Sequence, residues 1–311
     1  MLSRVAANLY WLSRYVERSD GILRMLKIYY ASSQDSIQEF SWRPVIKIYT
    51  GLDENYVKQI EFNSREVLSY LVAGKENANS ITNIITLARE NARSVQDHIT
   101  KDLWQCLNEY YHLVKDQRLI STLRKDDPIS ALDILIKQVM LYYGTAEVTM
   151  ERGERRSFMN IGKYLERSIQ SIDILDSKFS TIDNGPDLLT DTTYWKHLLL
   201  SIGGYELYLK TYRQGFEAEN VLEMVVLNHD FPRSVLYSVG QISRYLDRLK
   251  INNTITEVKE LSFLVGRLHS RIKYSTIETI QEEGLHNYLY SVKKELYAIG
   301  NAVNIQYFAY S

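Results

Sequence analysis

Apolar residues recur along this chain at intervals of three and four, a spacing that places them on one face of an α-helix. The clearest stripe, which includes Leu9, Leu12 and Val16, belongs to a segment running from Leu2 to about Ser32. No segment shows the convincing alternation of polar and apolar residues that is typical of a strand. We therefore predict an all-α, multi-helix bundle. The expected helices are 2–32, 45–50, 64–72, 79–98, 101–124, 128–141, 155–179, 193–212, 218–227, 232–249, 257–274 and 277–308.

Residues with strong capping preferences mark several of these boundaries. Thr100 is typical of a helix N-cap, and Asp127-Pro128 combines a cap with proline at the first helical position. Gly74 is expected to end a helix. Asn184-Gly185-Pro186 is the clearest turn cluster and the best candidate for a boundary in the middle of the chain.

The composition supports a helical globular protein and excludes several other classes. The 311 residues include only 4 prolines and 14 glycines, so few residues interrupt helices. A hydrophobic content of 45% with 24% charged residues argues against disorder, and the length fits one large core or two fused halves. Cys106 is the single cysteine, which excludes a disulfide framework and a multi-cysteine metal site. The net charge of -1 makes a nucleic-acid partner unexpected.

Targeting and membrane signals are not evident in the sequence. The longest uncharged run, residues 296–311, is shorter than the roughly 20 residues that a membrane-spanning helix needs. Charged residues within positions 1–18 also interrupt any apolar core of a secretory signal. We therefore expect a cytoplasmic protein without a membrane partner.

A polar motif occurs twice along the chain. Residues 14–19 (RYVERS) match residues 163–168 (KYLERS), and their apolar neighbours match at the same offset. A second similarity, between Arg93-Ser94-Val95 and Arg233-Ser234-Val235, follows each copy near a predicted helix start. Internal duplication explains two ordered matches better than a chance likeness of amphipathic helices. The predicted organisation is one domain, 1–311, with pseudo-repeat halves 1–150 and 151–311.

Charged and aromatic residues occupy the face of the first helix that lies opposite its apolar stripe, which is unusual for a simple surface helix. Buried charges must be paired, because an unpaired buried ion costs on the order of several kcal/mol. Two interpretations stay open: an ion-pair network that fixes helix register, or a polar pocket that recognises a carboxylate- or phosphate-bearing ligand. The candidate residues are Arg4, Trp11, Arg14, Glu17, Arg18, Arg93, Lys163, Glu166, Arg167, Arg233 and His286. We expect Arg93 to join the first motif in one polar core, and Arg233 to join the second motif in the corresponding repeat set.

The chain offers little recognisable catalytic machinery. It contains no Walker A loop, dinucleotide fingerprint, HExxH motif or nucleophile elbow. We therefore expect no cofactor, and we assign no catalytic residue. Cys106 lies beside apolar residues of a predicted helix, where a buried, inert thiol is the favoured interpretation.

Two Glu-x-x-His spacings raise the alternative of a di-metal site. They are Glu109 with His112 and Glu283 with His286. In helical bundles two such pairs can join a glutamate from each of two other helices, roles that are open to Glu17 and Glu166. Such spacings also arise by chance, and a glycine interrupts the second one, so the metal site is the minor alternative.

Residues 2–18, with the sequence LSRVAANLYWLSRYVER, resemble the opening of the bacterial alpha-E family, an all-helical domain of unknown function named for its Glu-Arg motif. Shorter matches follow in the family's order over nearly the whole chain. They are residues 91–95, Trp104 with Asn108, 161–167, 232–234 and 284–286. Lys163 departs from the family pattern, in which arginine is usual; lysine keeps the charge but loses the planar fork.

The resemblance implies a setting but no established reaction. Genes of this family commonly lie beside circularly permuted ATP-grasp ligases and transglutaminase-like peptidases. The resemblance therefore suggests an accessory or binding protein, without intrinsic activity, that works with such a ligase or peptidase on a peptide-like amide product. The alternative is a helical-bundle enzyme with a di-metal carboxylate site or an amide-processing site built from the Glu-Arg clusters.

Overall fold

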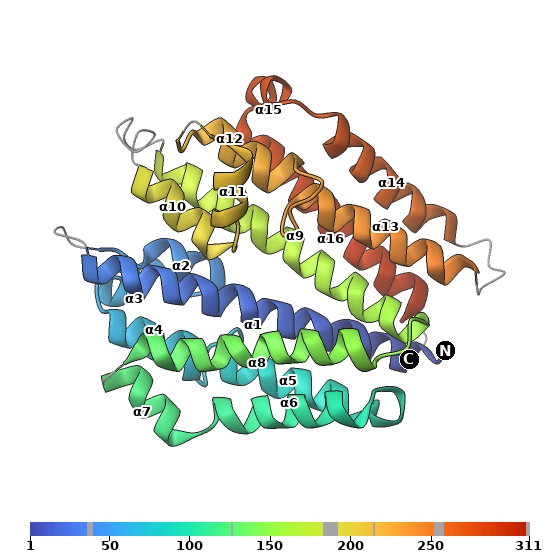
Figure 1. Cartoon of the computed structure of the whole chain (residues 1–311), viewed down its shortest axis with the longest axis horizontal. Coiled ribbons are helices and arrows are strands. Elements are labelled where there is room, and N and C mark those ends of the chain that lie inside the picture. Colours follow the sequence, from blue (N-terminus) through green and yellow to red (C-terminus); the bar gives the residue numbers. More distant parts are fainter. Residues whose placement is uncertain (36–39, 126, 183–191, 214, 252–257, 309–311) are drawn as a thin grey trace. The chain divides into compact units, whose positions relative to one another are not determined.

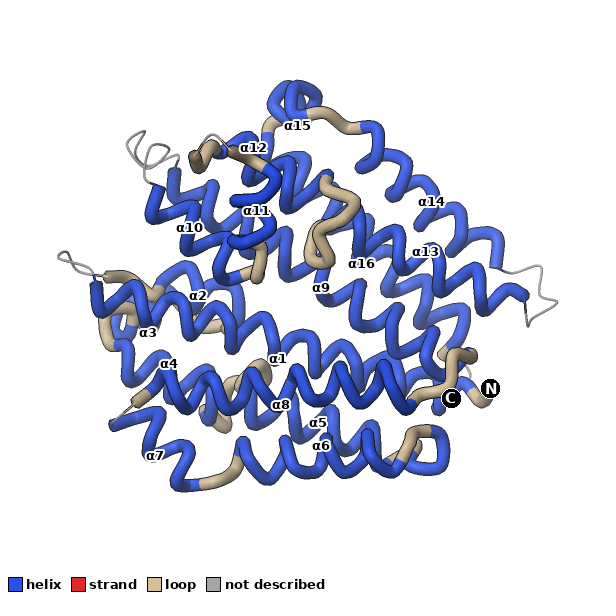
Figure 2. Tube along the Cα trace, in the orientation of Figure 1, coloured by secondary structure: helices blue, strands red, loops and turns tan. Residues whose placement is uncertain are grey.

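The computed structural model describes residues 1–35, 40–125, 127–182, 192–213, 215–251 and 258–308. Every regular element in these ranges is a helix, which confirms the all-α prediction (Figure 2). The predicted turn at Asn184-Gly185-Pro186 lies outside the described residues. None of the helices in these ranges combines the length and the apolarity needed to cross a bilayer.

The helices follow most of the predicted segments, and several predicted caps are confirmed. Thr100 accepts a hydrogen bond from Leu103 N, Asp127 accepts one from Ser130 N, and Gly74 is the C-cap of a helix. The elements are α1 (Ser3–Asp35), α2 (Arg43–Tyr49), α3 (Glu54–Ile60), α4 (Ser64–Ala73), α5 (Ile81–Arg93), the 3₁₀ turn η1 (Gln96–His98), α6 (Lys101–Val114), α7 (Gln117–Lys125), α8 (Pro128–Thr149), α9 (Glu154–Ile182), α10 (Thr192–Ser201), α11 (Tyr205–Thr211), α12 (Ala218–Leu222), the π-helical turn η3 (Glu223–Leu227), α13 (Val235–Ile251), α14 (Val258–Tyr274), α15 (Ile277–Glu283) and α16 (Leu285–Tyr307).

Three predicted helices are divided in the structure, and each break has a local cause. The segment 101–124 becomes α6 and α7, because Asp116 accepts a hydrogen bond from the backbone N–H of Arg118 and starts a new helix. The helices α15 and α16 meet at Gly284, whose φ of 85° is left-handed. Gly203, with a φ of 65°, lies between α10 and α11.

The helices α5 and α8 differ from their predicted lengths in opposite directions. Arg93 is the last residue of α5 and Ser94 is its C-cap, so the helix start predicted there is wrong. By contrast, α8 continues through Gly144 to Thr149, because a single glycine in a helix costs only about 1 kcal/mol. The pattern did not predict α3, which starts at the capping residue Asp53.

The helices form two compact units. The C-terminal unit comprises Met1–Arg14 and Glu151–Ser311, and the N-terminal unit comprises Tyr15–Met150. The boundary falls within α1, which therefore contributes residues to both units. The relationship between the halves 1–150 and 151–311 stays a prediction.

Four long helices of the C-terminal unit close into a ring. Helix α9 packs against α13, α13 against α14, α14 against α16, and α16 against α9. Figure 1 shows these helices in yellow-green to red. They bury aliphatic side chains such as Leu165, Val239, Leu268 and Leu296, each at most 1% exposed. Each buried side chain of this size contributes about 1.5–3 kcal/mol, so this core holds the helices together as a bundle.

The N-terminal unit contains a second arrangement of long helices, which uses the later part of α1. Helix α5 packs against α6, and α6 packs against α8 (Figure 1). Lys27 of α1 forms an ion pair with Asp133 of α8, with Nζ and Oδ1 2.6 Å apart. The Tyr110 hydroxyl of α6 donates to Ser19 Oγ of α1 at 3.2 Å. These contacts connect α1 to both α6 and α8.

Two glycines allow close packing around α9, Gly162 against α1 and Gly300 between α16 and α9. A Cβ atom at Gly162 of α9 would lie 2.3 Å from the backbone oxygen of Tyr10. A Cβ atom at Gly300 of α16 would lie 3.1 Å from Leu165 Cδ2 and 3.6 Å from the Tyr10 hydroxyl oxygen. Tyr10, which is 1% exposed, therefore lies against two glycines, and a larger residue at position 162 would force a helix to move.

Gly162→Ala should destabilise the C-terminal unit, because the new methyl group would overlap the main chain of α1. Overpacking of this kind costs about 1–3 kcal/mol. The matched control is Gly144→Ala in α8, where an added Cβ meets nothing within 4 Å and the helix should gain about 0.5–1 kcal/mol. Thermal unfolding followed by circular dichroism should give a lower melting temperature only for Gly162→Ala. Equal melting temperatures for the two variants would contradict the close packing at Tyr10.

Candidate functional site

The second motif copy forms a buried ion pair with the first helix. Glu166 of α9 contacts Arg14 of α1, whose Nε and Nη2 lie 2.8 Å and 2.7 Å from the same carboxylate oxygen, Oε2. Arg14 Nη1 also donates to the Tyr10 hydroxyl at 3.3 Å. The side chains of Arg14 and Glu166 are only 11% and 4% exposed. Removal of either partner would leave a buried charge, so the pair constrains how α1 and α9 pack.

The surroundings of Arg14 keep it charged. Burial acts to lower its pKa, but the Glu166 carboxylate and the Tyr10 hydroxyl together outweigh burial, and the pKa of Arg14 is raised. Burial also raises the pKa of Tyr10, so its hydroxyl stays protonated near neutral pH. The guanidinium carbon of Arg14 lies 4.8 Å from the ring centroid of Trp11, within range of a cation–π contact. Three of the candidate residues, Trp11, Arg14 and Glu166, are therefore brought together.

The motif arginine of α9 holds the segment that leads into α13. Arg167 Nη1 donates to the carbonyl oxygen of Pro232 at 3.2 Å, and Ser171 Oγ donates to that of Arg233 at 2.8 Å. Ser234 Oγ then accepts a backbone N–H of the first turn of α13 at 3.0 Å. The second Glu-Arg motif and the second Arg-Ser motif are thus in direct contact.

The Glu-Arg pair of the first motif copy lies in the N-terminal unit. Glu17, which has no exposed surface, accepts a hydrogen bond from the Tyr143 hydroxyl of α8. Arg18 Nη1 donates to Asn79 Oδ1 at 3.0 Å, and the next residue, Ser80, is the N-cap of α5. In both units the motif arginine therefore contacts a residue that lies just before a serine-capped helix.

Asn79, Tyr143 and Ser171 complete these contacts and were not among the predicted site residues. Helical periodicity does not identify them, because each belongs to an element far in sequence from the group it contacts. The sequence contains one signal for Asn79, because the pattern predicts that a helix starts near it. The pattern does not indicate which other helix lies against this start.

Arg93 and Arg4 lie apart from the buried motif contacts. Arg93 is 64% exposed, and its Nη1 lies 3.6 Å from Glu90 of the same helix. Arg4 is also exposed. The predicted polar core of Arg93 with the first motif is therefore wrong. Arg93 is the exposed last residue of α5, whereas Arg18 of the motif contacts Asn79, which lies before the start of α5.

Lys163 and His286 occupy other positions in the C-terminal unit. Lys163 Nζ lies 4.4 Å from the ring centroid of Tyr164. His286, at the start of α16, has its Nδ1 2.8 Å from Asp176 Oδ1 of α9. Because the His286 side chain is 70% exposed, its contact links two helices at the surface.

The residues of the di-metal alternative contact other side chains. They are Glu109, His112, Glu283 and His286. Glu109 accepts a hydrogen bond from Gln105 at 2.9 Å, and Glu283 is bound by Arg271. Within the described ranges, no three His, Cys, Asp or Glu side chains come together as metal ligands.

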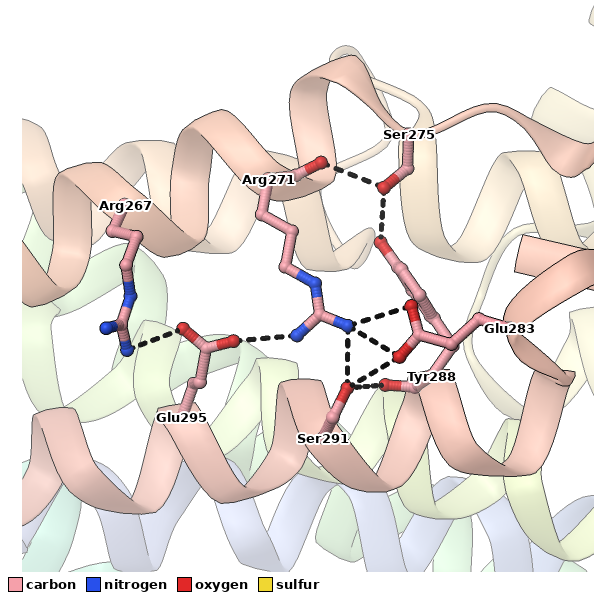
Figure 3. A network of polar contacts seen from close by, with 7 residues as sticks. All are labelled: Arg267, Arg271, Ser275, Glu283, Tyr288, Ser291 and Glu295. Carbon is pink, nitrogen blue, oxygen red and sulfur yellow. Dashed lines mark hydrogen bonds and ion pairs between the residues drawn. The ribbon is translucent and has the colours of Figure 1, made fainter. Parts of the chain in front are cut away.

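Glu283 belongs to an arginine-centred network that joins α14, α15 and α16 (Figure 3). Arg271 Nη1 lies 2.7 Å from Glu295 Oε1, and Nη2 lies 2.8 Å from both Glu283 Oε1 and Ser291 Oγ. The guanidinium carbon also lies 5.1 Å from the ring centroid of Tyr288. Charge-assisted bonds to several groups from one planar guanidinium fix how α14 is rotated about its own axis.

Cys106 is a buried thiol, as predicted. It is 4% exposed, and burial, with a smaller contribution from the Glu109 carboxylate, raises its pKa to about 11. The thiolate is the nucleophilic form of cysteine. At neutral pH the protein therefore holds this side chain in its unreactive form.

These contacts define a class of helical protein in which the glutamates of Glu-Arg pairs on long helices are buried, and the arginines contact the segment just before a later helix. The chain belongs to the Alpha-E family, whose model matches residues 1–308 and describes a predicted alpha-helical domain with a conserved ER motif. Both Glu-Arg pairs, Glu17-Arg18 and Glu166-Arg167, lie inside this match. The resemblance found at residues 2–18 is thereby confirmed. No curated protein and no solved structure matches the chain.

Arg14→Met should lower the free energy of unfolding by about 3–5 kcal/mol, because it leaves the Glu166 carboxylate buried without this cation. Adding Glu166→Gln to Arg14→Met should restore part of the loss. Arg93→Met is the control, since an exposed ion pair contributes only about 0–1 kcal/mol. Urea denaturation gives the free energy of unfolding of all three variants. If Arg14→Met and Arg93→Met have equal effects, the buried pair is not a structural constraint.

Cys106 should resist alkylation in the native protein. With a pKa of about 11, about a thousandth of the thiol is ionised at pH 8, and burial blocks access as well. Mass spectrometry after iodoacetamide treatment should show labelling in guanidinium chloride and little labelling without it. Ser94→Cys in a Cys106→Ser background supplies an exposed control that should react natively. Rapid native labelling of Cys106 would show that the thiol is accessible.

Proposed function

We propose that this chain is an accessory binding protein that works beside an ATP-grasp ligase and a transglutaminase-like peptidase in making or modifying a peptide-like amide product. The observation that carries the proposal is the burial of both motif carboxylates. Glu166 is committed to Arg14, and Glu17 accepts from the Tyr143 hydroxyl. The Glu-Arg motifs in this view build a rigid frame, and the frame presents surfaces to a partner.

The enzyme alternative requires an accessible acid or base, which the burial of both motif glutamates does not favour. A general acid or base must come within hydrogen-bond reach of the group that it protonates or deprotonates. Glu17 has no exposed surface, and the side chain of Glu166 is 4% exposed. An amide-processing reaction at either glutamate would therefore need the bundle to open before a substrate could enter.

We also infer that the two units derive from one duplicated bundle. Each has a motif helix (α1 or α9) whose arginine contacts the segment before a serine-capped helix (α5 or α13). The serine after each motif, Ser19 or Ser168, donates to the carbonyl three residues earlier, at 2.7 Å and 2.9 Å. In an experimental structure, α1, α5, α6 and α8 should superpose in that order on α9, α13, α14 and α16. A match in another order or direction would contradict the duplication.

Co-expression with the ATP-grasp ligase and the transglutaminase-like peptidase that the proposal expects beside its gene tests the accessory role. A tagged chain should retain the ligase or the peptidase through affinity and size-exclusion chromatography. Adding the purified chain should also raise the rate at which the ligase forms its amide product. The chain alone should not turn over the ligase or peptidase substrate. Turnover by the chain alone, or no complex and no effect on either enzyme, would contradict the proposal.

Matched arginine variants connect the motif to this role. Arg167→Met removes the bond to the Pro232 carbonyl and should weaken partner binding by about tenfold or more, as expected for a lost ionic hydrogen bond. Arg93→Met removes an exposed arginine and should leave binding unchanged. Circular dichroism must show that both variants stay helical. Equal partner affinities in the two folded variants would mean that the buried motif does not support binding.

A further inference from the structure

The C-terminal unit contains a pocket of about 630 Å³ that the motif contacts do not fill. This volume lies within the range of about 300–1,000 Å³ that is common for small-molecule sites. Three elements form its walls: the end of η3 with the loop after it, the first turns of α13, and α14. The lining residues are Leu227, His229, Leu236, Tyr237, Gly240, Gln241, His269 and Lys273.

The lining is rich in hydrogen-bond donors and contains no carboxylate. Lys273 is exposed and supplies a permanent positive charge, and among the described residues no Asp or Glu forms an ion pair with it. Gln241 and His269 add polar nitrogen atoms, and Leu227 and Leu236 supply apolar surface. An anionic group attached to an apolar body complements this combination of groups.

His269 presents an uncovered ring edge to this pocket. A Cβ atom at Gly240 would lie 3.4 Å from His269 Nε2, so glycine at that position leaves the imidazole accessible. Within the described ranges, no side chain or backbone group is hydrogen-bonded to the His269 ring. Burial lowers the pKa of His269, and Lys273 lowers it further, so the ring is neutral at neutral pH. It then offers one N–H donor and one acceptor.

Two networks described above hold the walls of this pocket. Residues two apart on an α-helix point about 200° from each other, so Arg271 projects away from His269 and Lys273. Its bonds to α15 and α16 (Figure 3) therefore keep the opposite face of α14 turned toward α13. On the other wall, Arg167 holds the Pro232 carbonyl just before α13 begins. Both walls are set before any ligand arrives.

We propose that this pocket binds the carboxylate of a small, partly apolar organic acid. Lys273 pairs with the carboxylate, the imidazole of His269 and the amide of Gln241 donate to its oxygens, and Leu227 and Leu236 contact the apolar portion. A phosphate group carries about −1.5 to −2 charges and is usually met by several cations, whereas one permanent cation lines this pocket. The proposal rests on the binding function proposed above and names the chemical class of its ligand.

Titration calorimetry with the purified full chain tests the ligand class. N-acetyl-L-leucine is the probe, N-acetyl-L-leucinamide is its neutral analogue, and inorganic phosphate is the competing anion. The acid should bind about tenfold or more tightly than the amide, since the ionic contact is lost in the amide. Phosphate should bind more weakly than the acid. Equal affinity for acid and amide, or tighter binding of phosphate, would overturn the proposal.

Two pairs of variants locate the probe. Lys273→Met should weaken binding of the acid by about tenfold or more, and Lys294→Met, which removes an exposed charge from α16, should leave it unchanged. Gly240→Val should block the probe, because the added side chain approaches His269. Gly266→Val on α14, where an added Cβ meets nothing within 4 Å, is its control. Unchanged affinity in Lys273→Met and Gly240→Val, with both melting temperatures retained, would place the probe elsewhere and overturn the assignment.

The outcome separates this inference from the accessory role, because the probe experiment uses the chain alone. Loss of probe binding with a preserved ligase or peptidase complex would overturn only the pocket. Probe binding without any complex would support the pocket and overturn only the partnership.

Discussion

The fold depends on one electrostatic constraint: charges that leave water must find partners inside the protein. Arg14 and Glu166 satisfy this requirement together, and Arg167 satisfies it with a backbone carbonyl. Close packing of apolar side chains already limits how far the long helices can slide or rotate. A buried guanidinium adds a further restriction, because its bonds have fixed lengths and directions. The Glu-Arg motif therefore adds to the constraints that define the register of the bundle.

The same contacts connect the motif to the surface. Arg167 and Ser171 position the segment Pro232–Ser234, which sets where α13 begins and which of its residues face the adjoining pocket. On the other side of that pocket, Arg271 sets the rotation of α14. Interactions that first look purely structural thus decide the shape and charge of a solvent-accessible site. A binding surface preorganised in this way loses less conformational entropy when a ligand arrives.

The sequence predicted local features well and long-range contacts poorly. Helical periodicity located α1 and α9, and capping chemistry located the starts of α6 and α8, because these signals come from residues close in the chain. Helical periodicity did not predict the helix breaks at Asp116 and Gly284, where a single residue divides a periodic segment. The partners of Arg18 and Glu17 were also missed, because Asn79 and Tyr143 approach them only after folding. Arg93 was misplaced for the converse reason, since a short sequence match carried no information about burial.

The packing around Tyr10 limits which residues can replace its neighbours in related sequences. Its backbone oxygen and its hydroxyl lie against Gly162 and Gly300, on two helices that are distant in sequence. A side chain gained at position 162 would meet the main chain of α1, which a smaller residue at position 10 would not remove, so α1 or α9 would have to shift. In relatives of this chain, the residue at position 162 therefore reports how closely these two helices approach one another.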